Sequence, residues 1–427
     1  MSYKRLFGIG FVFMVASVAW LILGGAMNDR TDRYQWELRD QVAELWGRPQ
    51  VQQAPRLDFE WETERKVRRT ESVDGQKTVV EEVVLDQHSE EQSVRSTDIE
   101  AKIGLDQRRK GLIWYSLYDL GFEGAWSYTH DREESGDLLL TFIFPDANGI
   151  YDGFHFRING EERADRLQPR DGRVEARVPV TPGQTVTLEV DYQTRGLDTW
   201  SYLPSEGVGN VEAFSMVATT DFTTIDFPSQ SLSPSSKSES DSGWVLNWDF
   251  ERVVTSYGMG VVVPSRIQPG ELASEMALSA PVSLLFFFVI LFVLATLRDI
   301  DIHPINYLFI AASFFAFHLL FAYTVDILPI TSAFILCSVV SMTLVVSYMR
   351  LVVSSRFAFM ETALAQLIYL IGFSLAHFSG SYTGLTVTIL SILTLFLLMQ
   401  LTGRLKWTDV LSSNTKVAPT HPVPSPA

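Results

Sequence analysis

The 427-residue sequence has a single cysteine, Cys337, and lacks the short motifs that mark common catalytic sites. With one cysteine the chain forms no internal disulfide, so its folded parts must be held by apolar cores. No His-Glu-x-x-His, Gly-x-Ser-x-Gly or Gly-x-x-x-x-Gly-Lys sequence occurs. We therefore expect a protein that is not an enzyme and that carries neither a metal ion nor a cofactor.

Charge is also missing from long stretches. No residue between Leu6 and Ala26 is charged, and apolar runs dominate from Met276 to Leu401. An uncharged apolar helix of about 20 residues can cross the hydrocarbon layer of a membrane. Six segments are long and apolar enough: 6–26, 276–297, 305–325, 327–349, 357–377 and 383–402; all are uncharged except 357–377, which contains Glu361. The sequence predicts one N-terminal transmembrane helix and a C-terminal bundle of five.

Basic residues in the short loops predict the orientation. Those outside residues 28–275 are Lys4, Arg5, Arg298, Arg350, Arg356, Arg404, Lys406 and Lys416. With six spans and a cytoplasmic N-terminus, every one of them falls on the cytoplasmic side, as the positive-inside rule requires. We predict a multi-pass protein of the bacterial inner membrane with both termini in the cytoplasm. The first segment could instead be a cleaved signal peptide, with Gly24 and Ala26 before the cleavage site, but its apolar run is longer than usual.

Residues 28–275 have the composition of a soluble domain and hold all but five of the 50 acidic residues. Several segments alternate apolar and polar residues, with turn signals at Asp171-Gly172 and Pro182-Gly183. This pattern predicts a large extracytoplasmic, β-rich, sandwich-type domain. Basic residues are interspersed with more numerous acids, so nucleic acid is not expected as a partner.

Some segments of the chain depart from the β pattern or follow the last span. Residues 29–46 have apolar residues at helical spacing and predict a short stalk helix. The serine-rich stretch 229–243 predicts an exposed loop, and 404–427 a disordered cytoplasmic tail. The predicted domains are therefore the anchor at 1–27, the periplasmic domain at 28–275, the bundle at 276–403 and the tail at 404–427.

Aromatic residues of the exported domain have two interpretations. Its tryptophans could form a glycan-binding platform, but tryptophan in β-rich segments more often packs in the core. We favour the core interpretation for Trp114, Trp126, Trp200, Trp244 and Trp248.

From His303 onward the stretch HPINYLFIAASFFAFHLLFAYTVD resembles, without a gap, a signature of the CreD family of bacterial inner-membrane proteins. RRKGLIWYSLYDLGFEG at 108–124, ELWGRPQ at 44–50 and LLMQLTGRLKW at 397–407 resemble other family blocks in the right order. The family layout of one span, a large periplasmic domain and about five further spans covers the whole chain. The resemblance implies a role in cell envelope integrity or the envelope-stress response, without enzymatic activity.

The chain departs from the family pattern in ways that make it a divergent member. The family's Glu-His becomes Asp326-Ile327, and the Gly that follows becomes Pro329. A role that rests on that histidine would not transfer to this chain.

Ionisable residues inside membrane spans are costly and suggest function. His318, Asp326 and His377 fall in the outer half of the predicted bundle and could form a polar cluster, whereas Glu361 starts the fifth span at the inner side. The alternative is that Asp326 and His377 lie in water or headgroups while His318 makes one interhelical hydrogen bond. His303 lies about 22 Å below His318 on a helical rise, too far to share a metal ion. The estimated difference in depth between His318 and His377, about 8 Å, argues against a haem.

The leading interpretation is a non-enzymatic membrane protein that acts through its periplasmic domain, with the lipid bilayer, other envelope proteins or cell-wall glycans as partners. One alternative is a transporter or channel that uses the C-terminal bundle, where Ser and Thr of the fourth span could line a pore. Another is a membrane-embedded enzyme, which would need polar groups converging at one depth. Flux measurements in proteoliposomes separate the first two.

Overall fold

The computed structural model describes residues 3–73, 76–164 and 168–403, and the chain divides into two compact units. The helical unit comprises residues 3–36, 111–113 and 267–403. The β-rich unit comprises the described residues of 37–110 and 114–266. The predicted tail, 404–427, lies outside the described residues.

The helices follow the apolar runs of the sequence. They are α1 (Tyr3–Trp46), α2 (Pro269–Leu297), α3 (Pro304–Thr324), α4 (Ile330–Val352), α5 (Ser355–Phe357), η2 (Ala358–Thr362), α6 (Ala363–Gln366), η3 (Leu367–Gly372), α7 (Phe373–Leu375), η4 (Ala376–Tyr382) and α8 (Thr383–Thr402). Six helices of the described chain are long and apolar enough to cross a membrane, with Ser355–Gly380 counted as one. Residues 29–46 are helical as predicted and continue α1 without a break.

Two helix starts show how local chemistry sets the boundaries. At α3, Pro304 occupies the first turn, where a missing N–H costs nothing, and the ring of His303 accepts a hydrogen bond from the Ile305 N–H at 3.3 Å. At α2 the helix begins at Pro269, earlier than the predicted 276. Its first turns pack on α1: the Ser274 hydroxyl donates to the Gly24 carbonyl at 2.9 Å.

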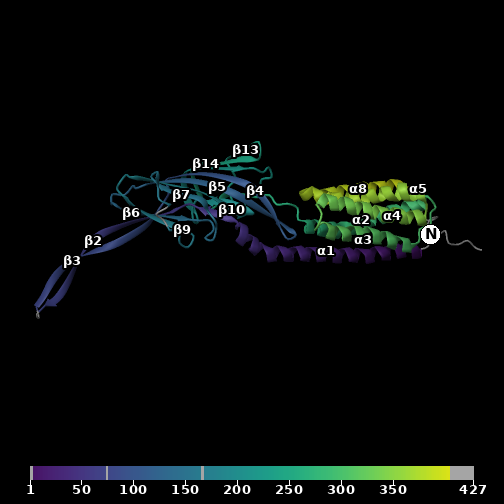
Figure 1. Cartoon of the computed structure of the whole chain (residues 1–427), viewed down its shortest axis with the longest axis horizontal. Coiled ribbons are helices and arrows are strands. Elements are labelled where there is room, and N and C mark those ends of the chain that lie inside the picture. The colour runs from purple at the N-terminus through teal and green to yellow at the C-terminus, as the bar shows by residue number, and fades with distance from the viewer. Residues whose placement is uncertain (1–2, 74–75, 165–167, 404–427) are drawn as a thin grey trace, which may run out of the picture. The chain divides into compact units, whose positions relative to one another are not determined.

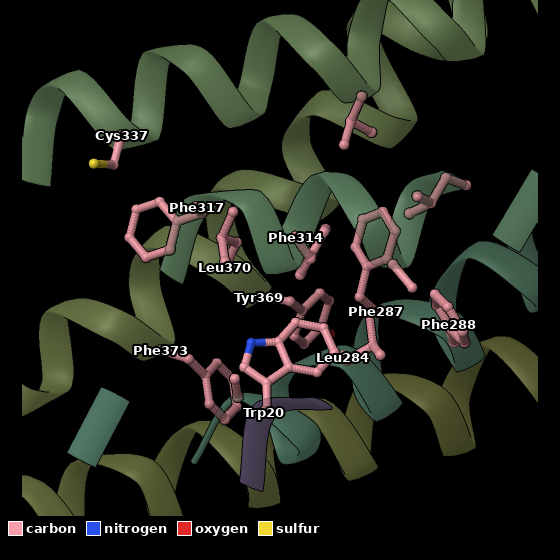
Figure 2. Close-up of a cluster of buried hydrophobic side chains, with 14 of the residues drawn as sticks. Trp20, Leu284, Phe287, Phe288, Phe314, Phe317, Cys337, Tyr369, Leu370 and Phe373 are labelled. Atoms are coloured by element: carbon pink, nitrogen blue, oxygen red, sulfur yellow. The ribbon is translucent and has the colours of Figure 1, made fainter. Parts of the chain in front are cut away.

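The helical unit has one continuous apolar core (Figure 2). Trp20 of α1 is fully buried among side chains of other helices. Leu284 and Phe287 of α2 and Tyr369 of η3 belong to the same cluster of buried side chains (Figure 2). Phe287 lies 4.6 Å from Phe314 of α3, measured between ring centroids. Close packing of such large side chains stabilises the association of α1 with the other helices.

The fifth apolar helix is not a regular α-helix. It contains two π-helical segments, η2 and η3, in which each carbonyl bonds five residues ahead instead of four. Wide turns of this kind leave carbonyl groups without a helical partner. Here the Ser283 hydroxyl of α2 donates to the Tyr369 carbonyl in η3. An interhelical hydrogen bond therefore stabilises the irregular segment.

The strands of the β-rich unit follow the alternating segments of the sequence. They are β1 (Gln50–Gln53), β2 (Arg56–Val73), β3 (Gln76–Gln92), β4 (Ser96–Lys110), β5 (Ile113–Thr129), β6 (Gly136–Ile143), β7 (Asp152–Ile158), β8 (Glu161–Glu162), β9 (Arg173–Val180), β10 (Thr185–Leu197), β11 (Thr199–Leu203), β12 (Gly209–Thr220), β13 (Ser236–Glu239), β14 (Trp244–Thr255) and β15 (Met259–Val262). The prediction of a β-rich region is confirmed.

These strands form three sheets that share one apolar core. The orders are β13-β14-β12-β4-β5-β10-β7-β8, β3-β2-β6-β9 and β1-β11-β15. Most pairs are antiparallel, but β12 pairs with β4 and β1 with β11 in parallel. Figure 1 shows β2 and β3 continuing beyond β6 and β9 of their own sheet.

The turn signals act as predicted. Pro182 and Gly183 connect β9 to β10, and Gly183 has a φ of 76°, which a glycine adopts without steric cost. The Gln184 N–H donates to the Thr181 carbonyl at 3.0 Å and closes this turn.

The serine-rich stretch differs from its prediction as one exposed loop. Residues Ser236–Glu239 form β13, a short edge strand that pairs antiparallel with β14. Its four side chains are exposed, so no apolar alternation reveals it. The edge of β14 supplies the hydrogen bonds that make this polar segment a strand.

Candidate functional site

The β-rich unit has an open groove with a volume of about 1130 Å³. Part of its floor is the outer face of the eight-stranded sheet, where Gly104 of β4, Gly121 of β5 and Gln193 of β10 lie. Gly121 and Gln193 are directly opposite each other in the β5–β10 pair. A Cβ atom at Gly121 would meet only the Cβ of Lys102, at 3.7 Å. The groove is therefore hollow partly because glycines occupy outward positions where other residues would fill it.

Charged side chains project from this floor and are oriented by hydrogen bonds. Arg195 of β10 lies opposite Asp119 of β5, and its Nε donates to the Asp119 carboxylate at 2.8 Å. Asp221 accepts a hydrogen bond from the Leu105 N–H at 2.7 Å, which orients its carboxylate. These groups are solvent-accessible, so their remaining donors and acceptors can bind a polar ligand.

One rim of the groove is a loop held by a tyrosine. The Tyr151 hydroxyl donates to the Asp146 carbonyl and accepts from the Asp146 N–H, both at 2.8 Å. Burial raises the pKa of Tyr151 to about 12, so its hydroxyl stays protonated at neutral pH. Neighbouring Ile150 is 82% exposed and gives the rim an apolar contact point.

Another part of the lining is the end of α1, residues 43–46, followed by Gly47. Gly47 has a φ of 107°, and any Cβ there would collide with the Arg195 carbonyl. Only glycine allows the chain to leave the helix so close to β10. The Leu197 N–H then donates to the Arg48 carbonyl at 3.2 Å and fixes this connection.

The groups that line the groove are of types that bind polar ligands. Among the described residues that line the groove there is neither histidine nor cysteine, so a hydroxyl nucleophile has no imidazole base. In the described chain, no group of three or more His, Cys, Asp or Glu side chains could hold a metal ion. Carboxylates, a guanidinium, amides and hydroxyls beside aromatic and aliphatic groups are the types that bind sugar hydroxyls.

The intramembrane candidates of the sequence lie in the helical unit. His318 is buried on α3, and its Nδ1 lies 3.1 Å from the Phe314 carbonyl one turn earlier in the same helix. Its ring meets Trp20 of α1 edge-on, with centroids 5.8 Å apart. The hydrogen bond is therefore within the helix, whereas the alternative interpretation expects an interhelical one.

The other two candidates have different surroundings. Asp326 pairs with Arg30 of α1, with a closest N–O distance of 2.9 Å. His377 is buried near the end of the fifth apolar helix. Glu361 pairs with Arg298 at 2.6 Å. The sequence prediction placed Arg30 in the domain at 28–275, whereas Arg30 belongs to the helical unit, which is why this partner of Asp326 was missed.

We expect the Arg30–Asp326 pair to contribute to the packing of α1 on the other helices. Both side chains are mostly shielded from solvent, at 25% and 15% exposure. Asp326→Ala should lower the free energy of unfolding by about 1–2 kcal/mol, between the values for surface and buried pairs. Thermal unfolding of the protein in detergent measures this loss. The exchanged variant, Arg30→Asp with Asp326→Arg, should recover most of it, and equal destabilisation of both variants would contradict an ionic role.

Three of the five tryptophans considered in the β-rich unit are buried, as the core interpretation expects. Trp126, Trp200 and Trp248 are at most 3% exposed. Trp114 and Trp244 are half-buried, and each ring is covered by a cation, Arg266 at 4.4 Å and Lys237 at 5.6 Å from the centroid.

Sequence reasoning missed the groove residues because no motif marks them. A usable signal was present in β5, where Gly121 follows Asp119 at the outward positions of the part of the strand that alternates, from Tyr118 onward. Outward glycines on adjacent strands indicate a hollow only once the strand order is known.

Comparison with known proteins adds little to this geometry. No family model and no curated protein sequence matches the chain. A solved structure from Legionella pneumophila subsp. pneumophila, described provisionally as a nutrient binding protein, shares 12% identity and a TM-score of 0.27 over 45% of this chain and 73% of its own. A likeness this low carries no argument about fold or function. The CreD resemblance therefore stays a prediction that rests on the quoted residues.

Proposed function

We propose that this chain is a multi-pass protein of the bacterial inner membrane, of the CreD type, whose β-rich unit lies in the periplasm and supports envelope integrity without catalysis. Six long apolar helices support membrane insertion. The basic residues Arg298 and Arg350 end α2 and α4, which supports a cytoplasmic position for those helix ends. In this arrangement both termini are cytoplasmic.

The groove of the β-rich unit is the observation that carries the functional proposal. Its volume of about 1130 Å³ exceeds the usual range for small-ligand pockets, about 300–1,000 Å³. An open groove of that size suits a segment of an extended polymer. Its exposed carboxylates, guanidinium and amides, with apolar Ile150 on the rim, favour a polyhydroxylated ligand. The cell-wall glycan, a chain of N-acetylated hexosamines, has this chemistry and is present in the periplasm.

Filling the groove tests the proposal. Gly121→Trp places a large ring on the floor without backbone strain, because the glycine has ordinary dihedral angles and open space above it. We expect binding of soluble cell-wall glycan fragments to weaken at least about tenfold, because a displaced ligand loses several contacts. Isothermal titration of the purified full chain in detergent measures the affinity.

Ala125→Trp is the matched control. Ala125 is exposed on the same strand and the same face, four residues further on, and does not line the groove. This variant should bind glycan as the unchanged protein does. No binding by the unchanged protein, or equal losses in both variants, would contradict glycan recognition at the groove.

A transporter or channel remains the second candidate, because polar side chains connect three of the helices. Gln366 donates to the Ser341 hydroxyl at 3.0 Å, and Ser341 donates to the Ser313 carbonyl at 2.9 Å. The bonded chain equally suits helix association. Ion or solute flux in proteoliposomes that depends on Gln366 would favour transport over the binding function.

A further inference from the structure

Three buried side-chain oxygens of the fifth apolar helix lie close together in the sequence and have no hydrogen-bond partner among the described residues. They are Oε2 of Glu361, Oγ1 of Thr362 and Oε1 of Gln366. Thr362 and Gln366 are 0% exposed, and the segment between them, α6, contacts both α2 and α4. An unpaired polar atom is costly in a protein interior, and more so in a membrane, where water is scarce. The three oxygens together therefore indicate a bound ligand.

The hydrogen bonds of Gln366 determine which end of its amide is unpaired. The Ser341 Oγ lies 2.9 Å from the Ser313 carbonyl oxygen, which can only accept, so the Ser341 proton points there. The lone pairs of Ser341 then accept from the Gln366 Nε2 at 3.0 Å. The unpaired atom of the amide is therefore the carbonyl oxygen Oε1, which needs a donor or a cation.

The π-helical turn η2 accounts for the unpaired hydroxyl of Thr362. A threonine in a regular helix commonly donates to the carbonyl four residues earlier, as Thr324 does to Leu320 at 2.8 Å. The corresponding carbonyl for Thr362 is that of Ala358, which bonds to the N–H of Ala363, five residues ahead of it. The wide turn thus changes the geometry in which the hydroxyl would close back on its own helix, and the hydroxyl is left for another partner.

The spacing of the two enclosed residues suits one small ligand. Thr362 and Gln366 are about one helical turn apart, so their Cβ atoms lie about 5–6 Å from each other on the same face. At 1.5 Å per residue, Gln366 is about 16 Å from the helix start at Ser355, which is the middle of a hydrocarbon layer about 30 Å thick. In transporters, ion sites commonly lie at this depth, where a helix departs from regular geometry.

Glu361 supplies negative charge to the site. One of its carboxylate oxygens pairs with Arg298 at 2.6 Å, whereas the other is unpaired. The Arg298 side chain is 53% exposed and is therefore screened by water, but the Glu361 side chain is only 15% exposed. A cation at the unpaired oxygen would be attracted by a carboxylate that its arginine neutralises only in part.

The donor set restricts the kind of cation. Hydroxyl, amide and carboxylate oxygens are hard ligands, which suit alkali and alkaline-earth ions rather than transition metals. One carboxylate, already shared with Arg298, is too little charge for a divalent ion. Complete burial of Thr362 and Gln366 leaves little room, which favours sodium over the larger potassium ion.

We propose that Glu361, Thr362 and Gln366 bind a sodium ion inside the helical unit, and that Ser341 holds the Gln366 amide with its oxygen toward the ion. This site is independent of the groove and of its ligand. No sequence motif marks it, because a single carboxylate, a hydroxyl and an amide are common in any chain. The sequence-based expectation that the protein carries no metal ion rested on motifs alone.

Binding of radioactive sodium to the purified full chain in detergent tests the proposal. We expect one saturable site per chain, from which unlabelled sodium chloride displaces the label more effectively than potassium chloride. Thr362→Val preserves the shape of the side chain and removes the hydroxyl. It should weaken sodium binding at least about tenfold, the scale on which groups around a metal site affect affinity.

Thr343→Val is the matched control for this exchange. Thr343 is an exposed residue of α4, and its hydroxyl donates to the Val339 carbonyl at 2.8 Å. This variant should bind sodium as the unchanged protein does. The proposal would be overturned by the absence of saturable binding, by equal affinity of the unchanged protein and Thr362→Val, or by more effective displacement with potassium.

Thermal unfolding supplies a second readout, which separates loss of the ion from loss of the fold. Replacing about 200 mM choline chloride with the same concentration of sodium chloride should raise the unfolding temperature of the unchanged protein by about 3 °C or more. Thr362→Val should show no such rise. In choline chloride it should unfold at the same temperature as the unchanged protein or slightly higher, because a buried hydroxyl without a partner has been removed.

The order of the two proteins should therefore reverse or converge between the two salts. Equal rises in the unchanged protein and in Thr362→Val would assign the effect to bulk salt and would contradict the site. Greater stability of Thr362→Val in both salts would show that water, rather than sodium, occupies the three oxygens, and would also overturn the proposal.

Discussion

Trp20→Ala should lower the free energy of unfolding of the helical unit by about 3–5 kcal/mol, the range for removal of a fully buried tryptophan. The indole is 0% exposed and contacts α3 directly, with Phe315 at 5.5 Å and His318 at 5.8 Å between ring centroids. Alanine leaves a cavity that neighbouring rings can close only in part. The expected result is therefore weakened association of α1 with the other helices.

Thermal unfolding in detergent, followed by circular dichroism at helical wavelengths, measures this loss. Trp36→Ala is the control, because Trp36 belongs to the same helix but is 81% exposed. It should change stability by less than about 0.5 kcal/mol. Similar losses in the two variants would mean that Trp20 does not join α1 to the other helices.

Trp200→Ala should destabilise the β-rich unit by a comparable amount, about 3–5 kcal/mol. Trp200 lies on β11 of the three-stranded sheet, is 0% exposed, and its ring centroid lies 6.4 Å from that of Phe122 on β5. It therefore links two sheets through the common core. Urea unfolding followed by near-ultraviolet circular dichroism reports the loss, and half-buried Trp244→Ala should lose clearly less.

Substitution by phenylalanine separates packing from hydrogen bonding in the same core. The Trp126 Nε1 donates to the Tyr202 hydroxyl at 2.9 Å, whereas the Trp200 Nε1 has no hydrogen-bond partner among the described residues. Trp126→Phe removes a satisfied bond and should cost more than Trp200→Phe, by about 1 kcal/mol. The reverse order would contradict this account of the core.

Periodicity and charge predicted the main helices and strands because both can be read directly along the sequence. The uncharged runs indicated the long helices, and Pro304 after His303 marked the start of one of them. Alternation in β10 and the β-rich composition of the first half of β5 indicated strands. The start of α2 was misplaced because Glu271 and Glu275 interrupt the apolar run while the helix already packs on α1.

The groove and the Arg30–Asp326 pair could not be predicted, because both depend on contacts between residues far apart in the sequence. The groove depends on Gly121 standing beside β4 and β10, which is a matter of strand order. Arg30 and Asp326 are 296 positions apart, and neither sequence neighbourhood indicates the other. The strand β13 was missed because its residues are all exposed and its pairing is set by a neighbour. His318 bonds within its own helix and Asp326 pairs with Arg30, so the cluster of His318, Asp326 and His377 stays a prediction.

The π-helical segments of the fifth apolar helix change which of its residues lie on the same face of the helix. Each wide turn accommodates an additional residue, and one residue of a regular helix corresponds to a rotation of about 100°. Thr362 and Gln366 precede η3, and Ser374 and His377 follow it, yet all four are buried. If η3 became a regular α-helix with all its residues kept, the later part of the helix would rotate by about 100° and turn Ser374 and His377 away from the interior. Deleting one residue between Leu367 and Gly372 should instead remove the wide turn and leave both side chains on the buried side. The wide turn therefore absorbs one residue and keeps these two polar groups in line with Thr362 and Gln366.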